Sequence, residues 1–180
     1  MGPSSLMELI LKDSRRTFQV VLVASICMIG VAFYMENFLQ LEPCILCYMQ
    51  RGAVIAFGVI AALGIIVNPK KLNSYRLFVL SILIFALIGA SLAIRQLYLQ
   101  SLPDELVPSC APDMEYLFDN LPFLEILILA FTGDGNCSEV LWTFLGISIP
   151  GWVLIGLCFV IIYCLIIFKF VNQIHSHNQN

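Results

Sequence analysis

Long apolar stretches dominate the chain, and four of them are long enough to cross a membrane as helices. They cover approximately residues 17–36, 48–67, 76–99 and 149–171. A hydrocarbon core about 30 Å thick takes about 20 residues of α-helix to cross. More polar segments at about 37–47 and 100–148 are predicted to be loops on one side of the membrane. The fold class predicted by this pattern is an all-α membrane protein, a four-transmembrane-helix bundle.

Composition agrees with this prediction. Apolar residues make up 60% of the chain and charged residues 12%, where soluble proteins average about 25% charged residues. The 180 residues are expected to form one integral membrane domain, 1–180, because little length is left for a second soluble domain. The net charge of -3 provides no basic patch, so no nucleic-acid partner is expected.

Charge location predicts the orientation. Basic residues flank the first span, the connection between the second and third spans, and the end of the fourth; they are Lys12, Arg15, Arg16, Lys70, Lys71, Arg76 and Lys169. The positive-inside rule therefore places both termini and the middle connection in the cytoplasm. The segment 100–148 contains acidic residues but no Lys or Arg. It is predicted to lie outside, as the second outer loop.

Part of the second outer loop is itself apolar. The stretch from Asp113 to Phe131 mixes apolar and acidic residues and contains Pro122. Its apolar run after Glu125 is too short to span the membrane, so we expect a short interfacial helix, kinked or broken at the proline. The alternative is a fifth span.

The seven cysteines divide into two groups. Four lie in the two outer loops or at their borders: Cys44, Cys47, Cys110 and Cys137. The outer compartment is expected to be oxidising, so disulfides can persist there. The other three, Cys27, Cys158 and Cys164, fall within spans and are expected to behave as small buried hydrophobes.

Cys44 and Cys47 form a C-x-x-C motif directly after Pro43. Proline suits the first helical position, so the motif is predicted to open the second helix, where the helix dipole stabilises a thiolate. Arg51 lies seven residues after Cys44 and four after Cys47, which puts all three on one helix face. An arginine at the membrane edge is a functional candidate, and the alternative is an ordinary interface anchor.

Other chemistries of a C-x-x-C motif fit less well. Haem attachment needs a histidine where Tyr48 stands, and a thioredoxin motif needs a soluble alternating fold. Four thiolates could hold zinc, but structural zinc sites usually take their ligands in close pairs, so no metal is expected. A static Cys44–Cys47 disulfide would close a very small loop and stabilise little. Thiol-disulfide exchange is the main hypothesis, and a scaffold protein with static disulfides is the alternative.

Three segments carry a family resemblance. PCILCYMQR, SCAPDMEYLFDNLP and GDGNCSEVLWTFLGISIPGW resemble the two outer loops of the bacterial disulfide bond formation protein B (DsbB) family, and the likeness extends from about Phe18 to Val171. Vitamin K epoxide reductase-like proteins also carry two thiol pairs in a helical bundle, but their loop pair precedes the C-x-x-C. Here the order is the reverse.

The resemblance implies a multi-pass enzyme of the bacterial inner membrane, a quinone-dependent protein-disulfide oxidoreductase. Its partner would be a periplasmic DsbA-like protein of thioredoxin fold, and its cofactor a membrane quinone, either ubiquinone or menaquinone. By position, Cys44 and Cys47 match the quinone-proximal pair, and Cys110 and Cys137 match the partner-facing pair. Arg51 matches the arginine that supports quinone binding.

Two positions depart from the family pattern. Gln50 stands where some members carry an acid, and Gln96 stands where some carry a histidine near the quinone. Gln96 can still offer hydrogen bonds to a quinone carbonyl, and Gln100 matches a polar family position. The alternative is that Gln96 and Gln100 merely face lipid headgroups.

The flanking residues suggest an order of attack. Cys110 lies between Pro108 and Pro112, which favour an extended, exposed peptide that a partner groove could bind. Cys137 lies in a glycine-containing turn close to the fourth span and is therefore nearer the membrane. We hypothesise that the partner attacks Cys110, and that Cys137 then attacks Cys44 and releases the Cys47 thiolate, as the family relay also implies.

Overall fold

Four long helices form the molecule. The computed structural model describes residues 14–107, 119–120, 122, 124–125, 128 and 135–177. Each long helix in this part of the chain is long and apolar enough to span a membrane, which confirms the four predicted spans. They extend a few residues beyond most of the predicted limits and run as α2 (Ser14–Leu39), α3 (Ile45–Val67), α4 (Leu72–Gln100) and α7 (Ile149–His177).

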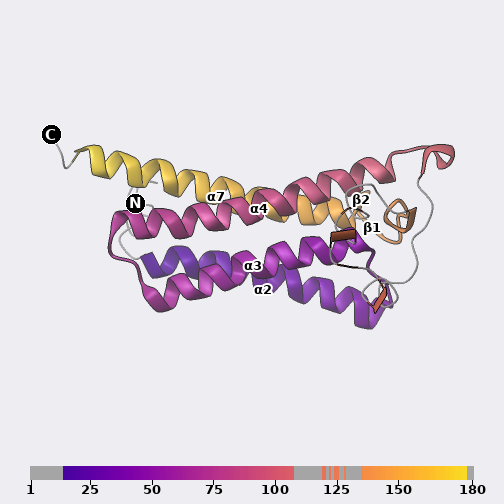
Figure 1. Cartoon of the computed structure of the whole chain (residues 1–180), viewed down its shortest axis with the longest axis horizontal. Helices are drawn as coiled ribbons and strands as arrows, with labels where there is room; N and C mark the ends of the chain where they lie inside the picture. Colours follow the sequence, from indigo (N-terminus) through magenta and orange to yellow (C-terminus); the bar gives the residue numbers. More distant parts are fainter. Residues whose placement is uncertain are drawn as a thin grey trace.

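The helices lie alongside one another as an elongated bundle (Figure 1). A tight turn joins α3 to α4: Asn68 adopts a left-handed conformation with φ 45° and donates its N–H to the Gly64 carbonyl at 3.0 Å. Asparagine tolerates this conformation better than most residues, and Pro69, which follows, cannot continue the helix. The connection is therefore short, and α3 and α4 pack as antiparallel neighbours.

A core of apolar side chains runs along the middle of the bundle. Phe18, Phe57, Ile82 and Leu157 are buried and come from the four different helices. Ser25 on α2 donates a hydrogen bond to the Val54 carbonyl on α3 at 3.0 Å, which satisfies a hydroxyl that would be costly to bury alone. The opposite faces of the helices expose large apolar side chains, as expected of surfaces that contact lipid.

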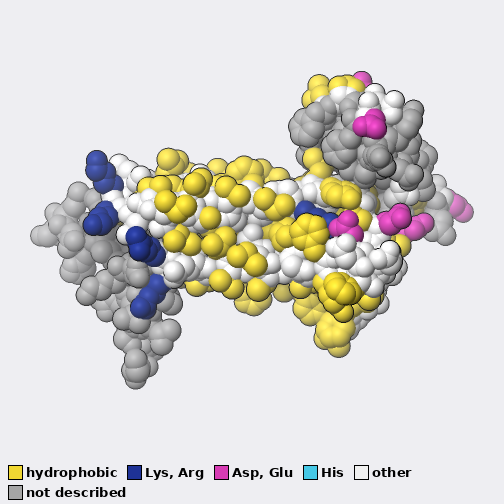
Figure 2. Space-filling view, turned by 90° about the horizontal axis from the view of Figure 1, so that it is seen from below, with side chains coloured by type: hydrophobic (Ala, Val, Ile, Leu, Met, Phe, Trp, Pro, Cys, Tyr) yellow, Lys and Arg dark blue, Asp and Glu magenta, His cyan; other side chains and the backbone are white. Residues whose placement is uncertain are grey.

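The two ends of the bundle differ in charge. Figure 2 shows most of the visible Lys and Arg side chains at one end, acidic side chains toward the other, and a hydrophobic band between them. We call the first the basic end; it contains Ser14, the α3–α4 turn with Lys70 and Lys71, and the end of α7 (Figure 1). The opposite end carries Cys44, Cys47 and Cys137 and is called the cysteine end.

At the cysteine end, short elements connect α4 to α7. They are the 3-10 turns η1 (Asp104–Leu106) and η2 (Gly135–Cys137) and an antiparallel hairpin of β1 (Thr143–Phe144) and β2 (Ile147–Ser148). Most of the predicted interfacial helix, Asp113 to Phe131, lies outside the described residues, and that prediction is not confirmed.

The cysteines within spans have different surroundings. Cys164 is buried in the core, as expected. The expected burial is wrong for Cys27 and Cys158, which are exposed on the outside of the bundle. A thiol is apolar enough to face lipid, so position within a span does not require contact with the core.

Candidate active site

The motif cysteines open α3. Cys44 is the N-cap, with φ -74° and ψ 171°, and its carbonyl accepts the first helical hydrogen bond from the Tyr48 N–H at 3.1 Å. Ile45 is the first helical residue. Pro43 therefore precedes the N-cap, and its predicted place at the first helical position is wrong, because the extended Cys44 lies between it and the helix. Cys47 falls in the first turn, as the motif predicts.

The two thiols of the motif are in contact. Their Sγ atoms lie 3.3 Å apart, and both side chains are partly buried. Both cysteines are free thiols in this structure. Two thiols held in contact at a helix start can be interconverted with a disulfide with little change elsewhere.

Cys137 brings a third sulfur to the same place. It ends η2, is completely buried, and packs with Ile45, Leu46 and Leu99. Its thiol interacts with that of Cys44 and is the largest cause that raises the pKa of Cys44 above the ordinary 9.0; burial also raises it, and the interaction with Cys47 lowers it. The structure thus places Cys137 against Cys44, although they are far apart in the sequence.

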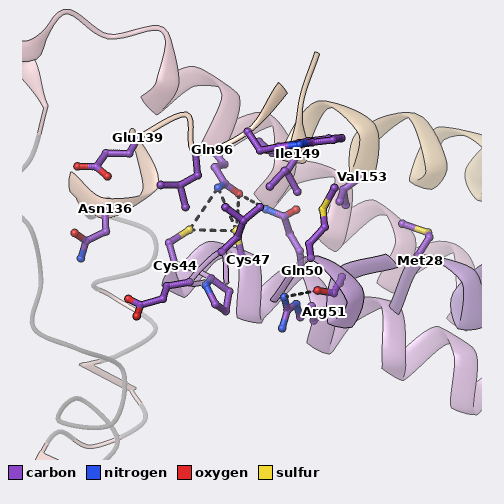
Figure 3. Close-up of a pocket in the computed structure, with 18 of the residues that line it drawn as sticks. Met28, Cys44, Cys47, Gln50, Arg51, Gln96, Asn136, Glu139, Ile149 and Val153 are labelled. Carbon is purple, nitrogen blue, oxygen red and sulfur yellow. Dashed lines mark hydrogen bonds between the residues drawn. The ribbon is translucent and has the colours of Figure 1, made fainter. Parts of the chain in front are cut away.

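Two buried glutamines, Gln50 and Gln96, lie beside the motif thiols (Figure 3). The Gln96 Nε2 lies 3.4 Å from the Cys44 Sγ and 3.3 Å from the Cys47 Sγ. The Gln50 Nε2 donates to the Gln96 Oε1 at 2.7 Å. Gln96 was predicted near the site and is found there, whereas Gln50 was noted only as a departure from the family. Its place on the same turn as Arg51 was the one sequence signal for it.

Arg51 faces α2. Its guanidinium forms an ion pair with Glu36, donates to the Ala32 carbonyl at 3.3 Å, and lies over the Tyr48 and Phe33 rings. The shared helix face brings Arg51 close to the cysteines, but these contacts direct its charge toward α2 (Figure 3). Sequence reasoning missed Glu36. The sequence signal that could have indicated Glu36 was an acidic residue at the end of an apolar span.

Gln100 contacts the segment that follows Cys137. Its Nε2 donates to the Glu139 carbonyl at 3.4 Å, and its Oε1 accepts from the Ser148 hydroxyl at 2.8 Å. These bonds attach the end of α4 to the segment before the hairpin and to β2. Cys110, the remaining predicted site residue, lies outside the described residues.

A pocket connects these groups. Its lining includes Cys44, Cys47, Arg51, Gln96 and Gln100, and its volume is about 90 Å³. A second, apolar pocket of about 390 Å³ lies between α2 and α7. The two share lining residues, which are Met28, Ala32, Met35, Trp142, Ile149 and Val153. The thiols therefore border a small pocket, here called the thiol pocket, that contains several polar side chains and continues into the apolar pocket.

Three adjacent sulfurs, two of them in one C-x-x-C motif, are suited to thiol-disulfide exchange, in which a thiolate attacks one sulfur of a disulfide and displaces the other. Placed at one end of a spanning bundle, they define the class as membrane proteins with a thiol-disulfide exchange site. The model of the family described as disulfide bond formation protein DsbB matches residues 14–167. The chain belongs to this family, which supports a role in disulfide formation as an oxidoreductase.

Curated relatives agree. The disulfide bond formation protein B of Stutzerimonas stutzeri is 41% identical over 86% of this chain and 94% of its own length. That of Marinobacter nauticus is 42% identical over 77% of this chain and 82% of its own. Disulfide bond formation protein B 1 of Pseudomonas aeruginosa is 34% identical over 81% and 89%.

Proposed function

We propose that this chain is a membrane thiol:quinone oxidoreductase that reoxidises a periplasmic, DsbA-like partner of thioredoxin fold and passes the electrons to a membrane quinone. The observation that carries the proposal is the packing of Cys44 against the buried cluster that contains Cys137, where the two thiols interact, together with the contact between the Cys44 and Cys47 thiols. This packing links the second outer loop to the C-x-x-C motif. Such a link is needed to pass a disulfide from one pair of cysteines to the other.

The proposed relay conserves electrons at each exchange. The partner's thiolate attacks Cys110 of a Cys110–Cys137 disulfide, which forms a mixed disulfide and releases Cys137 as a thiolate. Cys137 then attacks Cys44 of the Cys44–Cys47 disulfide; the Cys44–Cys137 bond forms and the electron pair leaves on Cys47. The partner's second thiolate attacks its own mixed-disulfide sulfur, which yields the oxidised partner and a Cys110 thiolate. Cys110 displaces Cys44 from Cys137, so the outer disulfide returns and the motif is left as a dithiol.

A bound quinone would supply the final oxidant, accepting two electrons and two protons while Cys44 and Cys47 return to their disulfide. The residues fit such a group, because the thiol pocket, largely apolar with a few polar side chains, would take a ring and the apolar pocket an isoprenoid chain. The proposed quinone contacts are residues that line the thiol pocket: Cys47, Arg51, Gln96 and Gln100. Ubiquinone and menaquinone both meet these requirements.

We also propose a bacterial inner-membrane location with both termini in the cytoplasm. The basic end supports this orientation, because Lys and Arg are enriched on the cytoplasmic side of membrane proteins. Lys70 and Lys71 lie at that end and are exposed. The cysteine end would then face the periplasm, where disulfides are maintained.

Quinone reduction tests the proposal. Purified full-length protein is mixed with a reduced DsbA-like protein and either ubiquinone-1 or a short-chain menaquinone, and the quinone absorbance is followed. The expected result is partner-dependent reduction of at least one quinone. A static scaffold would reduce neither, and that result would refute the proposal.

Matched cysteine variants locate the activity. Cys44→Ala should abolish reduction, because it removes the sulfur that contacts both Cys47 and Cys137. Cys158→Ala removes a thiol that is exposed on the outside of the bundle and should leave the rate unchanged. Normal turnover in Cys44→Ala would show that the electrons take another route.

The order of attack gives a separate prediction. In Cys137→Ala, Cys110 cannot form the outer disulfide. With a partner that keeps only its attacking cysteine, oxidation by diamide should join Cys110 to the partner in a mixed disulfide that no thiol resolves, and this product should accumulate on a non-reducing gel. Cys110→Ala should trap nothing. A partner crosslinked to Cys137 in the wild-type cycle would contradict the order.

A further inference from the structure

The pair of glutamines beside the motif is unusual for the interior of an apolar bundle. Gln50 is 3% exposed and Gln96 is 4% exposed, and they come from neighbouring helices, α3 and α4. A buried primary amide is costly unless its donors and acceptor are satisfied. The partners here are the other glutamine and the two motif sulfurs, so the amides belong to the thiol site (Figure 3).

The hydrogen bond between the glutamines fixes a direction. Gln50 donates to the Gln96 oxygen at 2.7 Å, and the Gln96 amide nitrogen lies 3.3 Å from the Cys47 Sγ. The neutral Cys47 thiol also donates to that oxygen at 3.6 Å, a bond that the thiolate cannot make, whereas the Gln96 N–H can donate to the thiolate. An N–H donor stabilises a thiolate more than a neutral thiol, because hydrogen bonds to a charged acceptor are stronger. Gln96 therefore favours the charged form of the sulfur it contacts.

Arg51 is less well placed for this role in the described structure. Its guanidinium is held on α2 by Glu36 and the Ala32 carbonyl. The Gln96 Nε2, at 3.3 Å, is by contrast within hydrogen-bond distance of the Cys47 Sγ. The amide and the guanidinium thus occupy different parts of the pocket, and the amide is the one at the sulfur.

We propose that the Gln96 amide stabilises the Cys47 thiolate as it leaves Cys44, and that Gln50 is a positioning residue that keeps this amide in its donating orientation. The proposal rests on the proposed function, because the relay is what releases Cys47. In that step Cys137 bonds to Cys44, the Cys44–Cys47 bond breaks, and its electron pair remains on Cys47. Gln96 donates hydrogen bonds to that charge and exchanges neither electrons nor protons.

Alkylation of the reduced protein tests this without quinone or partner. Full-length protein in detergent is treated with iodoacetamide at pH 8, and tandem mass spectrometry resolves Cys47 from Cys44 within one peptide. In Gln96→Met, Cys47 labelling should slow by about tenfold, the size expected for a lost hydrogen bond to a charged group. Gln50→Met should slow it by less, about threefold, because the amide remains but can turn away.

A double-mutant cycle separates positioning from direct action. If Gln50 acts through Gln96, then Gln50→Met/Gln96→Met should label no more slowly than Gln96→Met alone. The matched control is Gln19→Met, the same chemical change at an exposed position near the basic end of α2, which should not alter labelling. If the double variant labelled more slowly than Gln96→Met by the same factor as Gln50→Met alone, Gln50 would act independently of Gln96, and its positioning role would be overturned.

Structural damage at the site would change the rate of Cys47 labelling in the opposite direction to the proposal. A loosened site would expose Cys47 and speed its labelling, with a lower Tm, whereas the proposal requires slower labelling at an unchanged Tm. If Gln96→Met does not fold, Gln96→Glu keeps the side chain's size and the acceptor for Gln50 but replaces the donor by an oxygen, and it should also slow labelling. Unchanged or faster labelling in the folded variant overturns the proposal, whatever the quinone assay shows.

Discussion

At the scale of single residues, Cys44 is the sulfur on which the proposed chemistry converges. It contacts Cys47 within the motif and Cys137 from the second outer loop, and Gln96 donates to it from α4. Its N-cap position puts this sulfur at the very start of α3, where it packs beside α4 and Cys137. A sulfur with two sulfur neighbours can exchange one bond for the other.

The raised pKa of Cys44 predicts its reactivity. A thiol whose pKa is above 9.0 is almost entirely protonated at neutral pH, and only the thiolate is alkylated. Cys44 in the reduced protein should therefore label slowly at pH 7, and its rate should still be rising at pH 9. Cys137→Ala removes the largest cause of the raised pKa and should speed Cys44 labelling at pH 8 by about threefold to tenfold. Equal rates with and without Cys137 would contradict the assigned cause.

Arg51 is predicted to act on the quinone. Arg51→Ala should raise the KM for quinone or slow its reduction by about tenfold, because a charged donor is lost from the pocket. Arg51→Lys should be intermediate, since an ammonium cannot reproduce the planar fork. Exchange between the partner and the Cys110/Cys137 pair should be retained.

The control for Arg51 is Lys71→Ala, which removes a cation at the basic end. Its quinone kinetics should match the wild type. If Arg51→Ala also matched the wild type, Arg51 would be an interface anchor, the alternative that its sequence position left open.

At the scale of helices, close packing between α2 and α3 sets the distance between Arg51 and Glu36. Glycines on α3 face bulky or polar groups on α2: a Cβ on Gly58 would meet the Ser25 hydroxyl, and one on Gly64 would meet the Phe18 ring. Small residues let membrane helices approach closely, where packing and hydrogen bonds, rather than exclusion of water, hold them together. The α2–α3 contact therefore depends on these positions being small.

Gly64→Ala tests this contact. The added Cβ would lie 2.8 Å from the Phe18 ring, a fully buried side chain with little room to move. We expect a loss of about 1–3 kcal/mol in stability, seen as a lower Tm in the same detergent. Gly30→Ala is the matched control, because a Cβ there meets nothing within 4 Å. It should be neutral or stabilising by up to about 1 kcal/mol, and an equal Tm for both variants would contradict the packing argument.

How far the sequence predicted the structure can be seen at this scale. Apolar length alone predicted all four spans, because a lipid-spanning helix must satisfy its own backbone hydrogen bonds. The C-x-x-C spacing predicted the contact of Cys44 with Cys47. Helix rotation was not predictable, since a helix surrounded by lipid is apolar on every side. For that reason the Glu36 partner of Arg51 and the Gln50–Gln96 bond became visible only in the fold.

At the scale of the whole molecule, all four long helices contribute to one end. The thiol pocket is lined by Ala32 from α2, Cys47 from α3, Gln96 from α4 and Val153 from α7, among others. The second outer loop adds Cys137 above them, held near α4 by the bonds of Gln100. The rest of the bundle separates this end from the basic end by the length of a membrane-spanning helix.

Topology is the corresponding prediction. Reporters fused after Lys71 should be active in the cytoplasm, and reporters fused after Asp104 should be active in the periplasm, because the basic end is expected to remain inside. Alkaline phosphatase and a fluorescent protein that folds only in the cytoplasm give opposite signals at each site. Reversed signals would place the thiols in a reducing compartment and remove the basis for a disulfide-forming role.

The apolar pocket between α2 and α7 has a consequence for how the protein would meet its oxidant. Several of its lining side chains, including Cys27, Val31 and Trp152, are also exposed on the outside of the bundle, so the pocket opens sideways toward lipid. A hydrophobic molecule that enters there diffuses in two dimensions, and its supply is set by its mole fraction in the bilayer. Diluting the sample with buffer would leave that supply unchanged, whereas adding lipid or detergent would lower it.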